Sequence, residues 1–136
     1  MRPVQRATYY LGLTNLAIGI AGFAGPLVTG NRDHLINIRP GFLLGVFAMN
    51  WLHALLHLVV GIAGLPSWRV PRSATGYMRL HTVLFGVLWA MGRLRVRGSS
   101  RIHMMMGMAL NAPANVVHAL WALIGLAFTL RRDARS

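Results

Sequence analysis

The chain alternates long apolar stretches with short polar connectors, and this pattern predicts its main elements. The apolar stretches run approximately over residues 7–28, 41–65, 77–92 and 102–130. A helix needs about 20 predominantly apolar residues to cross a lipid bilayer, and the second stretch provides 25 residues without an acid or an arginine. We therefore expect an all-α membrane protein in which residues 1–136 form a single transmembrane domain, a bundle of four transmembrane helices.

The polar side chains inside the second apolar stretch need an explanation. Asn50, His53 and His57 lie at positions i, i+3 and i+7, so a helix would carry all three on one face. That face is expected to point into protein, because an unpaired polar group is costly in lipid.

The fourth stretch carries a similar polar set, Asn111, Asn115 and His118, around Pro113. In a continuous helix the proline would leave the carbonyl of Ala109 without its donor and kink the helix. Alternatively, Asn111 caps a helix that begins directly after it, with the proline in the first turn.

The second and fourth stretches repeat each other with an offset of 61 residues, which places Asn50 on Asn111 and His57 on His118. Each half of the chain then contributes two helices, and both halves enter the membrane in the same direction. The bundle is therefore expected to consist of two parallel two-helix repeats related by an axis along the membrane normal. Under this symmetry the two histidines lie at equal depth, whereas His53 has no counterpart.

The composition favours a membrane location. Hydrophobic residues make up 55% of the chain, and the mean hydropathy is +0.52. All 14 basic residues are arginines, and with two acids they give a net charge of +12. The expected partners of these arginines are the anionic headgroups of the lipid bilayer. No nucleic acid is expected, because the arginines lie between apolar stretches and do not form a basic groove with aromatic residues.

The distribution of arginines predicts the orientation in the membrane. Eight arginines on the side of the termini, against six on the other side, favour cytoplasmic termini.

Two motifs resemble the hallmark segments of a family of small bacterial four-helix integral membrane proteins that is catalogued as a domain of unknown function: Asn50-x-x-His53-x-x-x-His57-Leu58 and Asn111-x-x-x-Asn115-x-x-His118. The resemblance extends over about residues 7–130. It implies a four-helix fold in the bacterial inner (cytoplasmic) membrane and assigns no reaction. The chain departs from the family pattern at Ala54, where a second asparagine is usual, and at Ala114, where an acid is frequent.

The main interpretation of the polar residues is structural. Asn50, Asn111 and Asn115 would form a polar cluster with the histidines, in which the side chains bond to one another and to backbone carbonyls of neighbouring helices. The protein would then be a structural or accessory membrane subunit that docks onto a larger membrane complex or forms a homo-oligomer.

A cofactor site is the alternative interpretation. His57 and His118 have the matched depth that the two axial ligands of a haem require, which would make the chain an electron-transfer protein. A metal ion held by His53, His57 and His118 is a variant of this interpretation. A small transporter or channel is a weaker alternative.

The sequence argues against an enzyme. It contains no cysteine, and no acid lies inside an apolar stretch. No carboxylate is therefore expected in the bundle to act as an acid or a base, or to orient a catalytic histidine. His34, His81 and His103 lie near the predicted membrane interfaces, and no role is assigned to them.

Overall fold

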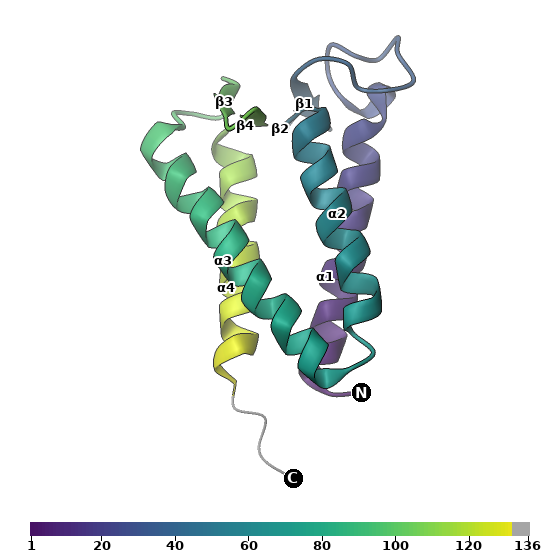
Figure 1. Ribbon diagram of the computed structural model, residues 1–136. Coiled ribbons are helices and arrows are strands. Elements are labelled where there is room, and N and C mark those ends of the chain that lie inside the picture. The colour runs from purple at the N-terminus through teal and green to yellow at the C-terminus, as the bar shows by residue number, and fades with distance from the viewer. Residues whose placement is uncertain (132–136) are drawn as a thin grey trace.

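The computed structural model describes residues 1–131. Four helices make up most of this chain, and a short antiparallel hairpin precedes each of the second and fourth helices. In chain order, the elements shown in Figure 1 are α1 (Pro3–Phe23), the 3-10 turn η1 (Gly25–Leu27), β1 (Gly41–Leu43), β2 (Phe47–Met49), α2 (Trp51–Ser67), α3 (Pro71–Arg95), β3 (His103–Met105), β4 (Met108–Leu110) and α4 (Ala112–Leu130).

The helices form two pairs that lie side by side (Figure 1). α1 packs along α2, and α3 packs along α4. Both hairpins lie at one end of the helices, where β2 contacts β4, whereas the N-terminus and the end of α4 lie at the opposite end. The hairpins therefore link the two helix pairs at one end, and the short connection from α2 to α3 links them at the other.

Four helices are present as predicted, but the predicted starts of the second and fourth are wrong. Residues 41–49 and 103–110 form the two hairpins, so α2 begins at Trp51 and α4 at Ala112. Each hairpin turns through two successive residues with positive φ, Leu44 with Gly45 and Met106 with Gly107, a conformation typical of tight hairpin turns. Hydropathy missed these hairpins because their strands are as apolar as the helices.

The first and third helices also differ from the prediction. α3 has 25 residues, Pro71–Arg95, and extends beyond both ends of the apolar stretch at 77–92. α1 begins at Pro3 and ends at Phe23, before the predicted end at residue 28. Among the helices of residues 1–131, α4 alone is long and apolar enough to cross a bilayer by itself, with a mean hydropathy of 1.5, and α2 is a shorter apolar helix.

The backbones of α1 and α2 touch at glycines. A Cβ atom on Gly19 would lie 2.6 Å from the backbone nitrogen of Leu58, and a Cβ atom on Gly61 would overlap the backbone of Leu16. Small residues permit such close packing of helices. The contact also holds Asn15 of α1 against α2, which matters for the histidines described below.

Gly61→Ala is expected to destabilise the protein by about 1–3 kcal/mol, because the added methyl group forces two packed backbones apart. Gly86→Ala is the matched control. Its Cβ atom would meet only the Cβ of Ala122, at 3.8 Å, so this change within α3 is expected to be neutral or to stabilise by up to about 1 kcal/mol. Thermal unfolding in detergent measures both variants, and equal unfolding temperatures would contradict the close packing of α1 on α2.

Candidate functional site

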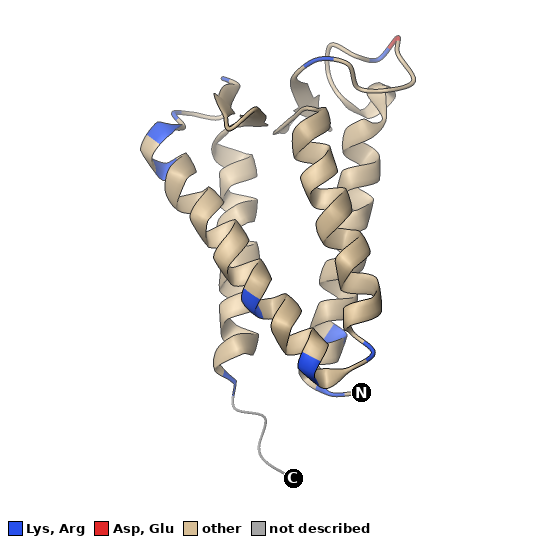
Figure 2. Ribbon diagram, viewed as in Figure 1, with Lys and Arg blue, Asp and Glu red and all other residues tan. Residues whose placement is uncertain are grey.

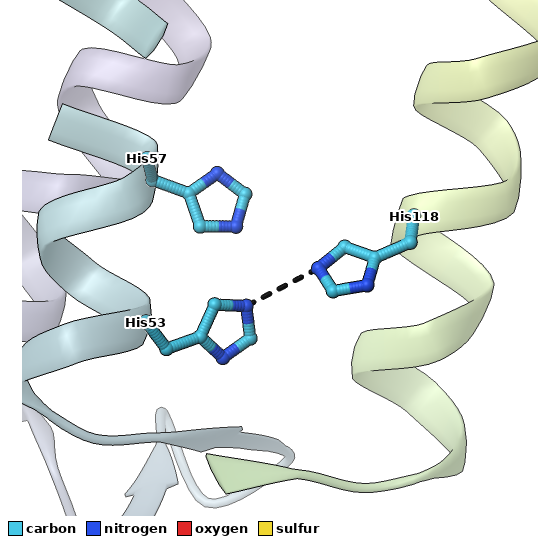
Figure 3. Close-up of side chains that lie close together, drawn as sticks. All are labelled: His53, His57 and His118. Atoms are coloured by element: carbon cyan, nitrogen blue, oxygen red, sulfur yellow. Dashed lines mark hydrogen bonds between the residues drawn. The ribbon is translucent and has the colours of Figure 1, made fainter. Parts of the chain in front are cut away.

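Three imidazole rings converge between the two helix pairs (Figure 3). His53 and His57 project from successive turns of α2, and His118 projects toward them from α4. The Nε2 atoms of His53 and His118 are 3.2 Å apart, and one ring nitrogen from each of the three residues lies within 4.8 Å of the other two. All three side chains are at most 2% exposed. The prediction that His53 and His57 face the interior with His118 is confirmed.

Backbone carbonyls fix the protonation of His53. Its Nδ1 atom lies 2.8 Å from the carbonyl oxygen of Ala109 and 3.2 Å from that of Ala48. A carbonyl oxygen only accepts hydrogen bonds, so Nδ1 must carry the proton in the neutral ring. The Nε2 atom, which faces His118, therefore presents a lone pair to the centre of the cluster.

Asn15 fixes the protonation of His57 in the same way. The Asn15 Nδ2 atom donates to the carbonyl of Leu11 at 2.9 Å, so the amide oxygen faces the Nδ1 atom of His57, at 2.7 Å. This oxygen is an acceptor, and His57 must therefore donate from Nδ1 and keep a lone pair on Nε2. Histidines that bind metal ions are commonly oriented by such a bond from the other ring nitrogen.

His118 completes a site that has more acceptors than donors. Its Nε2 atom donates to the lone pair of His53, and its Nδ1 atom has no hydrogen-bond partner within residues 1–131. The lone pair of His57 is then left without a donor from the other two rings. A buried cluster with surplus nitrogen lone pairs is suited to binding a cation.

His81 and Asn15 belong to the same polar network, although the sequence predicted a role for neither. His81 was predicted near a membrane interface. Instead it is 1% exposed, its Nε2 atom accepts from Asn15 at 3.1 Å, and its Nδ1 atom lies 3.3 Å from the carbonyl oxygen of Trp121. The sequence did not indicate this burial, because α3 begins at Pro71, before the apolar stretch, and His81 lies toward the middle of the helix.

Asn50 and Asn111 cap helices and do not line the imidazole cluster. The Asn111 side chain accepts from the backbone nitrogens of Ala114 and Ala48, and it donates to the carbonyls of Val46 and Ser99. Each of these four bonds is 2.8–3.1 Å long. Asn111 therefore caps α4 and also holds the hairpin that precedes α2.

Asn50 makes the corresponding contacts from the other helix. It accepts from the backbone nitrogens of His53 and Ala109, and it donates to the carbonyl of Gly107. The interpretation of Asn111 as a cap, with Pro113 in the first helical turn, is confirmed. The kinked-helix alternative is wrong, because the carbonyl of Ala109 lies in a strand and accepts from His53.

Asn115 lies apart from the histidines, contrary to its predicted place in the polar cluster. Its Nδ2 atom donates to the carbonyl of Trp89 at 3.2 Å, and its side chain packs on Gly92 so closely that a Cβ atom there would overlap it. Asn115 therefore belongs to the packing of α3 on α4.

The ring geometry fits one metal ion better than a haem. A haem bound through His57 and His118 would spread outward from the axis between them. The ring of His53 lies 5.1 and 5.3 Å from those two rings, and the ring of Phe85 lies 5.6 and 5.4 Å from them. These side chains occupy the space that the macrocycle would need.

An apolar groove leads to the cluster from the surface. It has a volume of about 310 Å³ and is lined by residues of α1, the first hairpin and α4, with His53 and His57 as its only titratable lining residues. The exposed side chains of Ala17 and Leu44 lie at its edge. The groove therefore connects the imidazoles with the outer surface of the bundle.

These features define a four-helix protein in which two asparagines cap helices and hold two hairpins beside a buried histidine cluster. A sequence model of the domain of unknown function DUF4383 matches residues 5–131, and the chain belongs to this family. The resemblance to an uncharacterised family seen in the sequence is thereby confirmed. No curated protein and no solved structure matches the chain.

Proposed function

We propose that the chain is an integral protein of the bacterial inner membrane, built from two parallel two-helix repeats, whose buried histidines bind one transition metal ion. No catalytic turnover is part of this proposal, because the described chain contains one acid, Asp33, which lies in an exposed loop. Membrane insertion and metal binding are supported by different observations, and each has its own test.

Exposed apolar side chains along all four helices support membrane insertion. Large examples are Ile20, Val59, Val83 and Leu123, each more than half exposed. Figure 2 shows arginines concentrated at the two ends of the helices, with an uncharged belt between them that is interrupted only on α3. Such a belt matches a bilayer whose headgroups meet the arginines at both interfaces.

The hairpins are compatible with a position at membrane depth. Non-helical backbone is tolerated there when its polar groups are satisfied by protein. The strands pair with each other, and Asn50 and Asn111 bond to further backbone groups of the opposite hairpins. This exchange of bonds also supports the proposal of two equivalent repeats.

Single cysteines test the topology, since the native chain has none. Ser100 lies in the loop before β3, at the hairpin end, and Ser73 lies in the first turn of α3, at the opposite end. In spheroplasts, a membrane-impermeant maleimide is expected to label Ser100→Cys at once and Ser73→Cys only after permeabilisation. Labelling of both cysteines in intact spheroplasts would contradict the spanning bundle, and the reverse order would contradict cytoplasmic termini.

The metal proposal rests on the convergence of the three histidines. Three nitrogens bound to a tetrahedral zinc ion at about 2.0–2.1 Å are about 3.3 Å apart. The separation of 3.2 Å between His53 and His118 already fits this value. The other separations are within 4.8 Å, so the rings need to close by at most about 1.5 Å. His118 can move its proton to the unpartnered Nδ1 atom when Nε2 binds the ion.

The ligand set favours zinc or copper, because neutral imidazole is a common ligand of both metals. To test the site, the protein is equilibrated with Zn²⁺ or Cu⁺ and unbound metal is removed. Elemental analysis then measures the metal that remains bound. The affinity tag must contain no histidine. We expect one ion per chain and no Soret absorption band.

A protein that remains metal-free after equilibration with both ions would contradict the metal site. The histidines would then serve as packing between helices, and the accessory-subunit interpretation would stand. A Soret band that shifts on reduction would instead indicate haem and would contradict the steric argument against it.

A further inference from the structure

The apolar groove and the imidazole cluster form one continuous feature. His53 and His57, two of the three candidate ligands, also line the groove. The remaining lining is formed by apolar side chains such as Ile18, Phe47 and Val117, with the hydroxyl of Thr14 as a polar exception. A molecule in the groove would therefore have its body against apolar side chains and one end against the bound ion.

The charge at the cluster requires an anion that the described chain does not supply. Three neutral imidazoles leave both positive charges of a divalent ion uncompensated. Within residues 1–131 the sole acid is Asp33, in the exposed loop between α1 and β1. A buried charge without a counter-ion is strongly disfavoured, and three histidines leave the fourth tetrahedral position open.

We propose that the groove binds a single-chain amphiphile with an anionic head, namely a long-chain fatty acid, whose carboxylate is the fourth ligand of the metal ion. This inference rests on the proposed metal site. The acyl chain matches the apolar lining, and the carboxylate neutralises one of the two positive charges of the divalent ion. A volume of about 310 Å³ lies at the lower end of the range for small-molecule sites, which favours one acyl chain over a two-chain lipid. Entry from the side of the bundle allows the ligand to come from the bilayer.

Cobalt(II) is the probe for this site, since its visible absorption bands report on the atoms that coordinate it. The Co²⁺-loaded protein is placed in phosphatidylcholine nanodiscs and titrated with oleate. We expect the bands to change and to saturate at one equivalent of oleate. Methyl oleate, which has the same chain without the negative charge, is expected to leave the bands unchanged.

Ala17→Phe tests whether the fatty acid reaches the metal ion through the groove. Ala17 is an exposed lining residue of α1, so a phenyl ring there fills the groove without entering the core. This variant is expected to bind Co²⁺ normally and to need at least tenfold more oleate for the same spectral change. Ile20→Phe is the matched control, because Ile20 is exposed on the same helix and does not line the groove. It is expected to behave as the native chain.

The possible failures are distinguishable. A Co²⁺-loaded protein whose bands ignore oleate, or respond equally to methyl oleate, would overturn the fatty-acid site and leave the metal site intact. An unchanged oleate response in Ala17→Phe would overturn the groove as the binding site. Absence of cobalt bands in the native protein, before any oleate is added, would overturn the proposed metal site itself.

Discussion

Replacing Asn111 with alanine is expected to lower the free energy of unfolding by about 3–6 kcal/mol. The change removes the cap of α4, worth about 0.5–2 kcal/mol. It also leaves the buried backbone nitrogen of Ala48 without this partner, at a cost of about 1–3 kcal/mol. The bonds to the partly exposed carbonyls of Val46 and Ser99 are lost as well, at about 0.5–1.5 kcal/mol each. Equilibrium unfolding in mixed detergent micelles measures the difference.

Two matched variants locate the origin of this effect. Asn111→Ser keeps an oxygen that can accept at the helix cap but loses the two bonds that Nδ2 donates, so an intermediate loss of stability is expected. Asn115→Ala removes a single bond, to the carbonyl of Trp89, and is expected to cost about 1 kcal/mol. If Asn111→Ala cost no more than Asn115→Ala, the proposed link between the hairpins and the two helix pairs would be wrong.

His118→Ala is expected to weaken zinc binding by about 100-fold or more. It removes one of three ligands, and loss of a group that only orients a ligand already typically costs about 10–100-fold. Asn15→Leu tests such an orienting group. It leaves all three ligands in place but removes the acceptor that holds His57 Nδ1 at 2.7 Å, so a loss of about 10–100-fold is expected. Competition with a chromophoric zinc chelator measures both affinities.

His103→Ala is the control for nonspecific binding, since His103 lies in β3 and its ring contacts the backbone of Arg97, outside the cluster. Its zinc affinity is expected to equal that of the native chain. Far-UV circular dichroism of every variant checks that the helices persist. Equal affinities in His118→Ala and His103→Ala would show that zinc binds elsewhere.

Hydrogen bonds connect the capping asparagines, the hairpins and the histidine cluster. The Nδ1 atom of His53 contacts the carbonyl of Ala48 in β2 and that of Ala109 in β4. Asn111 and Asn50 bond to the nitrogens of these same two alanines. The asparagines therefore fix the strands that in turn orient His53, and Asn111→Ala is expected to weaken metal binding as well as folding.

The sequence predicted the helices and the central histidines because both depend on simple spacing. Four apolar stretches separated by polar connectors are enough to predict four helices. The spacing of His53 and His57 by one helical turn places them on the same face, and the repeat offset predicts that His118 lies level with His57. These residues meet in the structure as expected.

The hairpins and the wider network could not be predicted in the same way. Apolar residues such as Leu44 and Met106 occupy turn positions with positive φ, where asparagine or glycine would have given a local signal. His81 is two residues from Arg79 in the sequence, which suggested an exposed position, but α3 places it in the core. Asn15 lies alone in its stretch, and its partners His57 and His81 come from two other helices.

X-ray absorption at the zinc edge is the measurement that tests the metal site most directly. Zinc-loaded native protein is predicted to show three imidazole nitrogens at about 2.0–2.1 Å and one oxygen, and His118→Ala is predicted to show no more than two imidazole nitrogens. A native spectrum without imidazole scattering, or one that is unchanged in His118→Ala, would contradict the assignment of His53, His57 and His118 as a metal site.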